Sequence, residues 1–186
     1  VIPDQFIDRT RGRISTFFGN GIAVHVEFSK PLCERLSKLM YEASQKTGAR
    51  IHRGGTYVCI EGPQFSTLAE SELYRSWNAH IIGMTNLQEA KLAREAEMGY
   101  ATMALVTDYD CWHVSHASVT VEQIIGNLQK NAETARQIIL ETVTNLDLSD
   151  PSPHANALAT SIITQPNFIS ERTKRELAPL IGKYLR

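Results

Sequence analysis

Two carboxylates in one short segment could do chemistry. Asp108 and Asp110 lie in residues 107–112 (TDYDCW), directly after the apolar run 100–106 (YATMALV). The run predicts a buried strand, so the carboxylates should lie just past its C-terminal end, where open α/β sheets bind ligands. A carboxylate at the mouth of an apolar site loses hydration, which favours its protonated form. It can then share a proton with a ring nitrogen or accept a hydrogen bond from an amino group, as adenine would require.

Two turns elsewhere in the chain could serve the same site. Residues 61–67 (EGPQFST) present an aromatic ring and a hydroxyl, Phe65 and Ser66, between a predicted strand and a helix. In residues 83–86 (GMTN), Thr85 lies at a predicted helix N-terminus, where backbone amides favour an anion. Each turn also has a simpler explanation, namely a helix cap, with Phe65 in the core.

Placement links the three segments. Each follows a predicted strand, over residues 56–60, 79–84 and 100–106, and each of the first two is followed directly by a predicted helix. The C-terminal ends of neighbouring parallel strands meet at one edge of a sheet. One shared site is therefore favoured over three unrelated loops.

Metal binding is a second possibility for the acidic loop, because Cys111, His113 and His116 lie near the carboxylates. Their spacing matches no zinc pattern, and no second Cys or His pair is close in sequence. We therefore expect no metal. A solvated acidic loop without chemistry remains the plain alternative.

The elements needed to position these segments alternate between strand and helix. This order predicts an α/β domain, residues 1–150, with helices against a parallel or mixed sheet. A loop rich in Ser, Asp and Pro then leads into a helical tail, residues 151–186, which should dock on its own subunit or a neighbour. Apolar periodicity and capping signals place helices at residues 29–48, 67–77, 86–98, 120–139 and within 167–186.

Composition narrows the function classes. The 186 residues carry a net charge of −1, which offers no basic field to nucleic acid or to an anionic membrane. No apolar run approaches the roughly 20 residues of a spanning helix. Cys33, Cys59 and Cys111 are few and widely spaced. We interpret them as reduced thiols of a cytoplasmic protein without a signal peptide.

Taken together, the motifs resemble those of the trimeric purine nucleoside phosphorylase family. The resemblance extends from residue 1 to about residue 166, and the combination is specific although each motif alone is weak. It is carried by residues 4–10 (DQFIDRT), His25, residues 61–66 (EGPQFS), residues 69–70 (AE), residues 83–85 (GMT) and residues 107–112 (TDYDCW).

The resemblance implies a three-layer fold with a mixed central sheet flanked by helices. It also implies that the N-terminal part of that fold is missing. Family members have an earlier half with a Gly-rich turn and an Arg-His pair, which supply most phosphate contacts, and this chain offers neither. We therefore expect the C-terminal two-thirds of such an enzyme. The remainder would be a separate or cleaved N-terminal fragment, and this chain alone would lack a complete phosphate site.

The resemblance also implies which purine base is preferred, through the residues at two positions of its motifs. Enzymes for 6-oxopurines are expected to carry Glu and Asn where this chain has Ser66 and Asp108. N1 of adenine accepts a hydrogen bond, which the Ser66 hydroxyl can donate, whereas the 6-amino group donates to a carboxylate. Both differences favour adenine.

The resemblance further implies roles and a reaction, the phosphorolysis of 5′-methylthioadenosine to adenine and 5-methylthioribose 1-phosphate. The substrates would be a purine nucleoside and phosphate, with no other cofactor, in a homotrimer. The implied roles are catalysis for Asp108 and Asp110; base binding for Phe65, Ser66, Asp108 and Asp110; the ribose and 5′ pocket for Met84, His25, Val121 and Ile124; and phosphate binding for Thr85.

Several alternatives stay open at this point. Val121 and Ile124 could be ordinary core positions of their helix. A hydrolytic nucleosidase would use the same base pocket with water as the nucleophile. A 6-oxopurine nucleoside phosphorylase or a non-catalytic nucleoside-binding subunit would share the fold.

Overall fold

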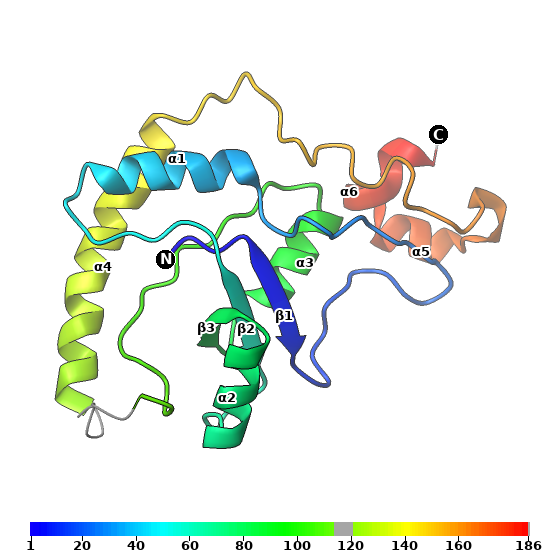
Figure 1. The fold of residues 1–186 in the computed structure, drawn as a ribbon. Coiled ribbons are helices and arrows are strands. Elements are labelled where there is room, and N and C mark those ends of the chain that lie inside the picture. Colours follow the sequence, from blue (N-terminus) through cyan, green and yellow to red (C-terminus); the bar gives the residue numbers. More distant parts are fainter. Residues whose placement is uncertain (114–120, 186) are drawn as a thin grey trace.

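A parallel sheet forms the centre of the molecule (Figure 1). The computed structural model describes residues 1–113 and 121–185, without the side chains of residues 121, 123 and 124. Within them, strands β1 (Gln5–Arg9), β2 (Thr56–Ile60) and β3 (Ala79–Gly83) pair in the order β1-β2-β3, and both pairings are parallel. The predicted strands at 56–60 and 79–84 are confirmed, whereas β1 was not predicted.

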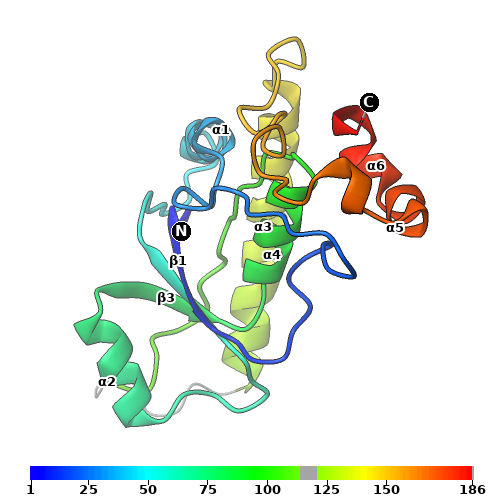
Figure 2. The ribbon, with the colours of Figure 1, turned by 90° about the vertical axis from the view of Figure 1, so that its right-hand side faces the viewer.

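The sheet is covered on both faces, which makes three layers. Alternate residues of a strand point to opposite faces, and the central strand β2 is buried on both. Helix α2 (Leu68–Ser76) and helix α3 (Leu87–Glu95) lie on opposite sides of the sheet (Figure 2). One core cluster contains Tyr57, Cys59 and Leu87 with Phe6, Phe28 and Ile81; the other contains Val58, Ile60 and Tyr74 with Ile7, Ala79, Ile82 and Met84.

Two further helices pack against each other beside the sheet. Helix α1 (Glu34–Gln45) ends close to Gly48, whose φ of +69° suits glycine, as its stop signal predicted. It packs on helix α4 (Val121–Thr144), the longest helix of the described structure. The capping signal predicted at residue 120 lies outside the described residues.

The C-terminal region docks on its own chain. It contains the short elements η1 (Pro166–Phe168), α5 (Glu171–Glu176), α6 (Ala178–Ile181) and η2 (Gly182–Tyr184). Figure 2 shows α5 and α6 beside the segment that follows β1. Their apolar side chains form a separate cluster with that segment, built on Ile22, Leu158, Ile169 and Ile181.

The predicted strand at residues 100–106 is wrong. This segment is extended, but it forms too few backbone hydrogen bonds with other segments to be a β-strand. Val1 and Ala104 exchange two backbone hydrogen bonds of 2.8 and 2.9 Å, and the Tyr100 carbonyl accepts from Cys33. Leu105 is 39% exposed and Val106 is 49% exposed. The physical reason is that an apolar segment becomes a strand only when a neighbouring strand pairs with it, and among the described residues no strand does.

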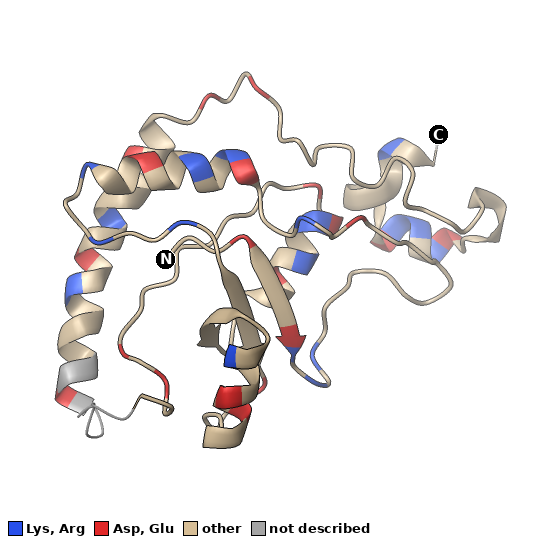
Figure 3. Cartoon of the chain, in the orientation of Figure 1, with Lys and Arg blue, Asp and Glu red and all other residues tan. Residues whose placement is uncertain are grey.

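Charges of both signs are mixed over the surface. Lys and Arg are interspersed with Asp and Glu along α1, α3 and α5 (Figure 3). Among the described helices, none has the length and apolar character needed to span a membrane.

Candidate active site

The turns after β2 and β3 lie against each other at the C-terminal edge of the sheet. Gly62 has φ +66°, and a Cβ built on it would lie 2.6 Å from the Met84 sulfur. Gly83 approaches even closer to β2, because a Cβ there would lie 2.0 Å from the Tyr57 hydroxyl. These glycines therefore allow residues 61–66 and 84–86 to meet, as the shared-edge argument predicted.

Arg13 joins these two turns, and sequence reasoning missed it. Its guanidinium donates to the Met84 carbonyl at 2.6 Å and to the Glu61 carbonyl at 2.5 Å, and its Nε lies 3.1 Å from Glu61 Oε2. The Arg11 amide also donates to Glu61 Oε2, at 2.6 Å. The hydrogen bond from Arg11 and the pairing with Arg13 lower the pKa of Glu61. A signal was present, because arginines alternate along the chain from the last residue of β1, at Arg9, Arg11 and Arg13.

The acidic loop is attached to α2 and to the turn after β2. Asp110 Oδ2 accepts from the Ser71 hydroxyl at 2.5 Å, and its Oδ1 accepts from the Cys111 amide at 2.8 Å. The Cys111 thiol lies 3.7 Å from the Ser66 carbonyl oxygen. The structure thus brings residues 107–113 to the turn that carries Ser66.

Aromatic contacts hold the rest of this loop. The Arg75 guanidinium of α2 lies 3.9 Å from the Trp112 ring centroid. Tyr109 and His113 stack with their ring centroids 4.5 Å apart. Because a cation over an aromatic face is attracted by the ring quadrupole, α2 fixes the loop through Trp112 as well as through Asp110.

The two predicted carboxylates occupy different surroundings. Asp108 is exposed, and its Oδ1 accepts from the Thr107 hydroxyl at 2.5 Å. Asp110 is half-buried and committed to Ser71 and Cys111. The desolvation expected at Asp108 is therefore not supplied by the described residues, whereas Asp110 acts as the anchor of the loop.

Ser66 and Phe65 face different environments although they are neighbours. The Ser66 hydroxyl oxygen is buried and has no hydrogen-bond partner among the described residues. Phe65 is 86% exposed, so the explanation that placed it in the core is wrong. A buried hydroxyl without a partner is unfavourable, so a ligand that accepts a hydrogen bond from Ser66 would remove this cost. The turn therefore offers a ligand the Ser66 donor and the Phe65 ring, both beside the acidic loop.

Thr85 and Asn86 begin α3. The Thr85 side chain is exposed, and its carbonyl accepts from the Cys59 thiol at 3.2 Å. Asn86 holds the N-cap position with φ +88°, but its side chain makes no capping hydrogen bond. Instead its Oδ1 accepts from the hydroxyls of Tyr100 and Thr102, at 2.9 and 2.8 Å. Asn86 therefore ties the segment before the acidic loop to the start of α3.

One predicted site residue, His25, is not brought to this edge. His25 is exposed, and its amide donates to the Ser161 carbonyl at 2.9 Å. The segment around it packs against the C-terminal region through Val24 and Val26, and this segment lies away from α2 (Figure 1). The side chains of Val121 and Ile124 lie outside the described residues.

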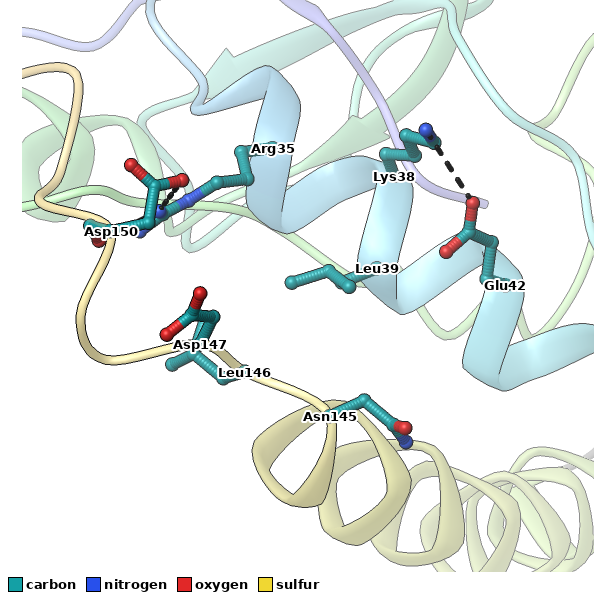
Figure 4. A pocket seen from close by; sticks show the side chains of 8 residues that line it. All are labelled: Arg35, Lys38, Leu39, Glu42, Asn145, Leu146, Asp147 and Asp150. Atoms are coloured by element: carbon teal, nitrogen blue, oxygen red, sulfur yellow. Dashed lines mark hydrogen bonds and ion pairs between the residues drawn. The ribbon is translucent and has the colours of Figure 1, made fainter.

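The structure has a pocket elsewhere, between α1 and residues 145–150, which follow α4 (Figure 4). Arg35 and Asp150 form an ion pair across it, and Lys38 lies 3.8 Å from Glu42. None of the predicted site residues whose side chains are described lines it. Within residues 1–113 and 121–185, no group of three or more His, Cys, Asp or Glu side chains is arranged to hold a metal ion.

These features define a layered α/β domain with polar residues gathered at the C-terminal ends of parallel strands. The chain belongs to the phosphorylase superfamily, whose family model matches residues 1–144. The family predicted from the motifs and the α/β fold class are thereby confirmed.

The chain is similar to S-methyl-5′-thioadenosine phosphorylases over nearly its whole length. It is 57% identical to that of Gloeobacter violaceus, covering 99% of this chain and 63% of the relative. It is 56% identical to that of Thermosynechococcus vestitus, covering 100% of this chain and 65% of the relative. The chain thus spans a little under two thirds of these relatives.

Solved structures agree in fold. A methylthioadenosine phosphorylase from an antarctic soil metagenomic library superposes with a TM-score of 0.89 at 46% identity, covering 96% of this chain and 64% of that chain. The methylthioadenosine phosphorylase of Schistosoma mansoni in complex with adenine gives 0.76 at 29% identity, covering 87% and 65%.

Proposed function

We propose that this chain belongs to an enzyme that cleaves 5′-methylthioadenosine with phosphate, giving adenine and 5-methylthioribose 1-phosphate. The observation that carries the proposal is the buried Ser66 hydroxyl beside the acidic loop, which has no hydrogen-bond partner within residues 1–113 and 121–185. The relatives that cover this chain are S-methyl-5′-thioadenosine phosphorylases, which supports the same reaction. The chain spans only part of their length, so the reaction is assigned to the complete enzyme.

Base recognition follows from hydrogen-bond polarity. The Ser66 hydroxyl donates to N1 of adenine, and the Asp108 carboxyl group pairs with the amino edge or shares a proton with N7. A 6-oxopurine carries N1–H and O6 instead, so it would leave buried groups unpaired. Each unpaired group costs about 1–3 kcal/mol, which favours adenine over hypoxanthine and guanine.

The chemical step separates charge, because the sugar becomes positive as the purine leaves with negative charge. Asp108 acts as the general acid that neutralises the departing base. Asp110 supports it by holding the loop on Ser71 of α2. Preorganised groups of this kind stabilise the transition state without a covalent intermediate.

The remaining roles follow the positions of the side chains. Exposed Phe65 stacks on the substrate, Met84 packs under the ribose, and Thr85 at the start of α3 binds phosphate. Val121 and Ile124 form the apolar wall around the methylthio group. Inorganic phosphate is the co-substrate, and the proposal includes no other cofactor.

We also propose a homotrimer in the cytoplasm. Exposed His25 would reach the 5′ pocket of a neighbouring subunit, because within its own chain it lies with the C-terminal region. A subunit interface would also cover exposed apolar side chains of α4, which include Ile125, Leu128, Ile139, Leu140 and Val143. The three cysteines are free thiols, in keeping with a reducing compartment.

One assay tests the reaction. The longest natural polypeptide that contains residues 1–186 is incubated with 5′-methylthioadenosine, with and without phosphate, and adenine is measured. Release that requires phosphate supports the proposal. Release without phosphate would identify a hydrolase, and faster turnover of inosine would identify a 6-oxopurine enzyme. Ligand-induced thermal stabilisation without any turnover would identify a non-catalytic binding subunit.

A further inference from the structure

Arg13 connects the two turns to which the proposed function assigns different parts of the substrate. The turn after β2 carries Ser66, and the turn after β3 carries Met84 and Thr85. Arg13 Nη2 donates to the Glu61 carbonyl at 2.5 Å, and Nη1 donates to the Met84 carbonyl at 2.6 Å. One rigid, planar group therefore sets the separation of the two turns.

The guanidinium is itself held from several directions. Its Nε pairs with the Glu61 carboxylate, which also accepts from the Arg11 amide at 2.6 Å. Nη1 lies 3.3 Å from Gln88 Oε1, and Gln88 Nε2 donates to the Thr10 hydroxyl at 2.8 Å. The Arg13 side chain is 25% exposed, which leaves it partly protected from solvent. This network links the ends of all three strands with the first turns of α3.

We propose that Arg13 is a positioning residue: it fixes the base-binding turn relative to the turn that binds sugar and phosphate, and does not itself contact the substrate. The inference rests on the proposed function. Cleavage of the glycosidic bond needs the base, the sugar and the phosphate in one geometry. Displacement of a reactant by about 1 Å can cost about 100-fold in rate.

The test distinguishes an effect on the relative position of the two turns from an effect on the affinity for adenine. The Arg13→Met variant keeps an aliphatic side chain but removes every donor. We expect its kcat for 5′-methylthioadenosine to fall about 10- to 100-fold. The dissociation constant of free adenine should stay within about threefold, because adenine contacts only the turn after β2 and the acidic loop. The Arg13→Lys variant should be intermediate, since a single ammonium can donate to either turn but cannot bridge both in the same way.

A matched control and a second measurement complete the experiment. Arg136→Ala removes an arginine that pairs with Glu133 on the exposed surface of α4, and it should leave kcat unchanged. Hydrogen exchange followed by mass spectrometry reports on residues 61–66 and 84–86. We expect faster exchange in both turns of Arg13→Met, with the rest of the sheet unchanged.

The outcomes are distinguishable. If the wild type releases adenine with phosphate and Arg13→Met has the same kcat, the inference is wrong. It is equally wrong if kcat and adenine affinity fall together while exchange rises throughout the sheet, because Arg13 would then be only structural. If the wild type has no phosphorolytic activity, the proposed function fails, and hydrogen exchange decides alone: unchanged exchange in both turns would overturn the positioning role.

Discussion

Asp108 and Asp110 have different surroundings although they belong to one motif. Asp110 is engaged by Ser71 and by the Cys111 amide, so its carboxylate stabilises the loop. Asp108 is exposed and hydrogen-bonded only to its neighbour Thr107 among the described residues. An anchored carboxylate cannot easily reorient toward a ligand, whereas an exposed one can. We therefore propose Asp108, rather than Asp110, for proton transfer to the leaving base.

Asp108→Asn should therefore abolish most activity and leave stability unchanged. We expect adenine release to fall about 100- to 10,000-fold, because an amide cannot supply the proton to the leaving base. Initial rates and thermal unfolding of the same preparation measure both effects. Wild-type turnover in the variant would remove Asp108 from the mechanism.

Ser66→Ala should weaken the binding of adenine without lowering the stability of the protein. The hydroxyl is buried and has no partner in the part of the chain that the structure describes, so its removal should leave the free energy of unfolding equal or slightly higher. Adenine would lose a hydrogen-bond donor, which weakens its binding by about 1–3 kcal/mol. Chemical denaturation measures the change in the free energy of unfolding, and adenine titration measures the change in affinity. Unchanged adenine affinity would contradict the assigned contact.

At the scale of elements, sequence patterns predicted the secondary structure correctly where the interacting residues are close in sequence. The capping signal behind the helix predicted at residues 67–77 is a capping box, in which Thr67 and Glu70 form both reciprocal hydrogen bonds. The strands at 56–60 and 79–84 and the turns after them were also predicted correctly. The strand at 100–106 was wrong because its state depends on a neighbouring strand that its own residues do not specify.

The turn after β2 allows a test of whether its backbone conformation requires glycine. Gly62→Ala should destabilise the protein by about 1–2 kcal/mol, because its φ of +66° is unfavourable for a residue with a Cβ. The new Cβ would also displace the Met84 side chain. Gly126→Ala within α4 is the matched control. Its Cβ would meet no atom within 4 Å, so it should stabilise the helix by about 0.5–1 kcal/mol. Denaturant unfolding measures both, and equal shifts would contradict the prediction.

At the scale of the whole molecule, Glu97 connects the sheet domain to the C-terminal region. Its Oε1 accepts from the Leu158 amide at 2.9 Å and from the Tyr184 hydroxyl at 2.5 Å, and its Oε2 lies 2.6 Å from Lys183 Nζ. Burial alone would raise the pKa of Glu97, but the hydrogen bonds from Lys183, Tyr184 and Leu158 outweigh it, so the pKa is lowered.

This lowered pKa predicts how stability changes with pH. The carboxylate of Glu97 contributes fully above the pKa of about 4.5 that it has when unfolded, and the contribution is lost as the pH falls through the lower folded value. Glu97→Gln should reduce the free energy of unfolding at pH 7 by about 1–3 kcal/mol. Wild type and variant should converge in strong acid. Denaturation at several pH values measures this effect.

The control for this prediction is Glu176→Gln. Glu176 pairs with Arg172 on the exposed surface of α5, where ion pairs contribute little. It should therefore leave the unfolding free energy nearly unchanged at every pH. A Glu97→Gln variant that behaved like this control would show that the C-terminal region does not depend on Glu97.

The sequence by itself determined the capping box of α2, two of the strands, the turns at the sheet edge and the residue types on which the proposed preference for adenine rests. These features depend on side chains within a few positions of one another, where spacing fixes which groups can meet. Only the tertiary structure decided that Arg13 bridges two turns, that Asp108 stays exposed while Asp110 is anchored, and that the C-terminal region closes on Glu97. Those contacts join residues about 40 to 90 positions apart, and chain packing rather than local spacing brings such residues together.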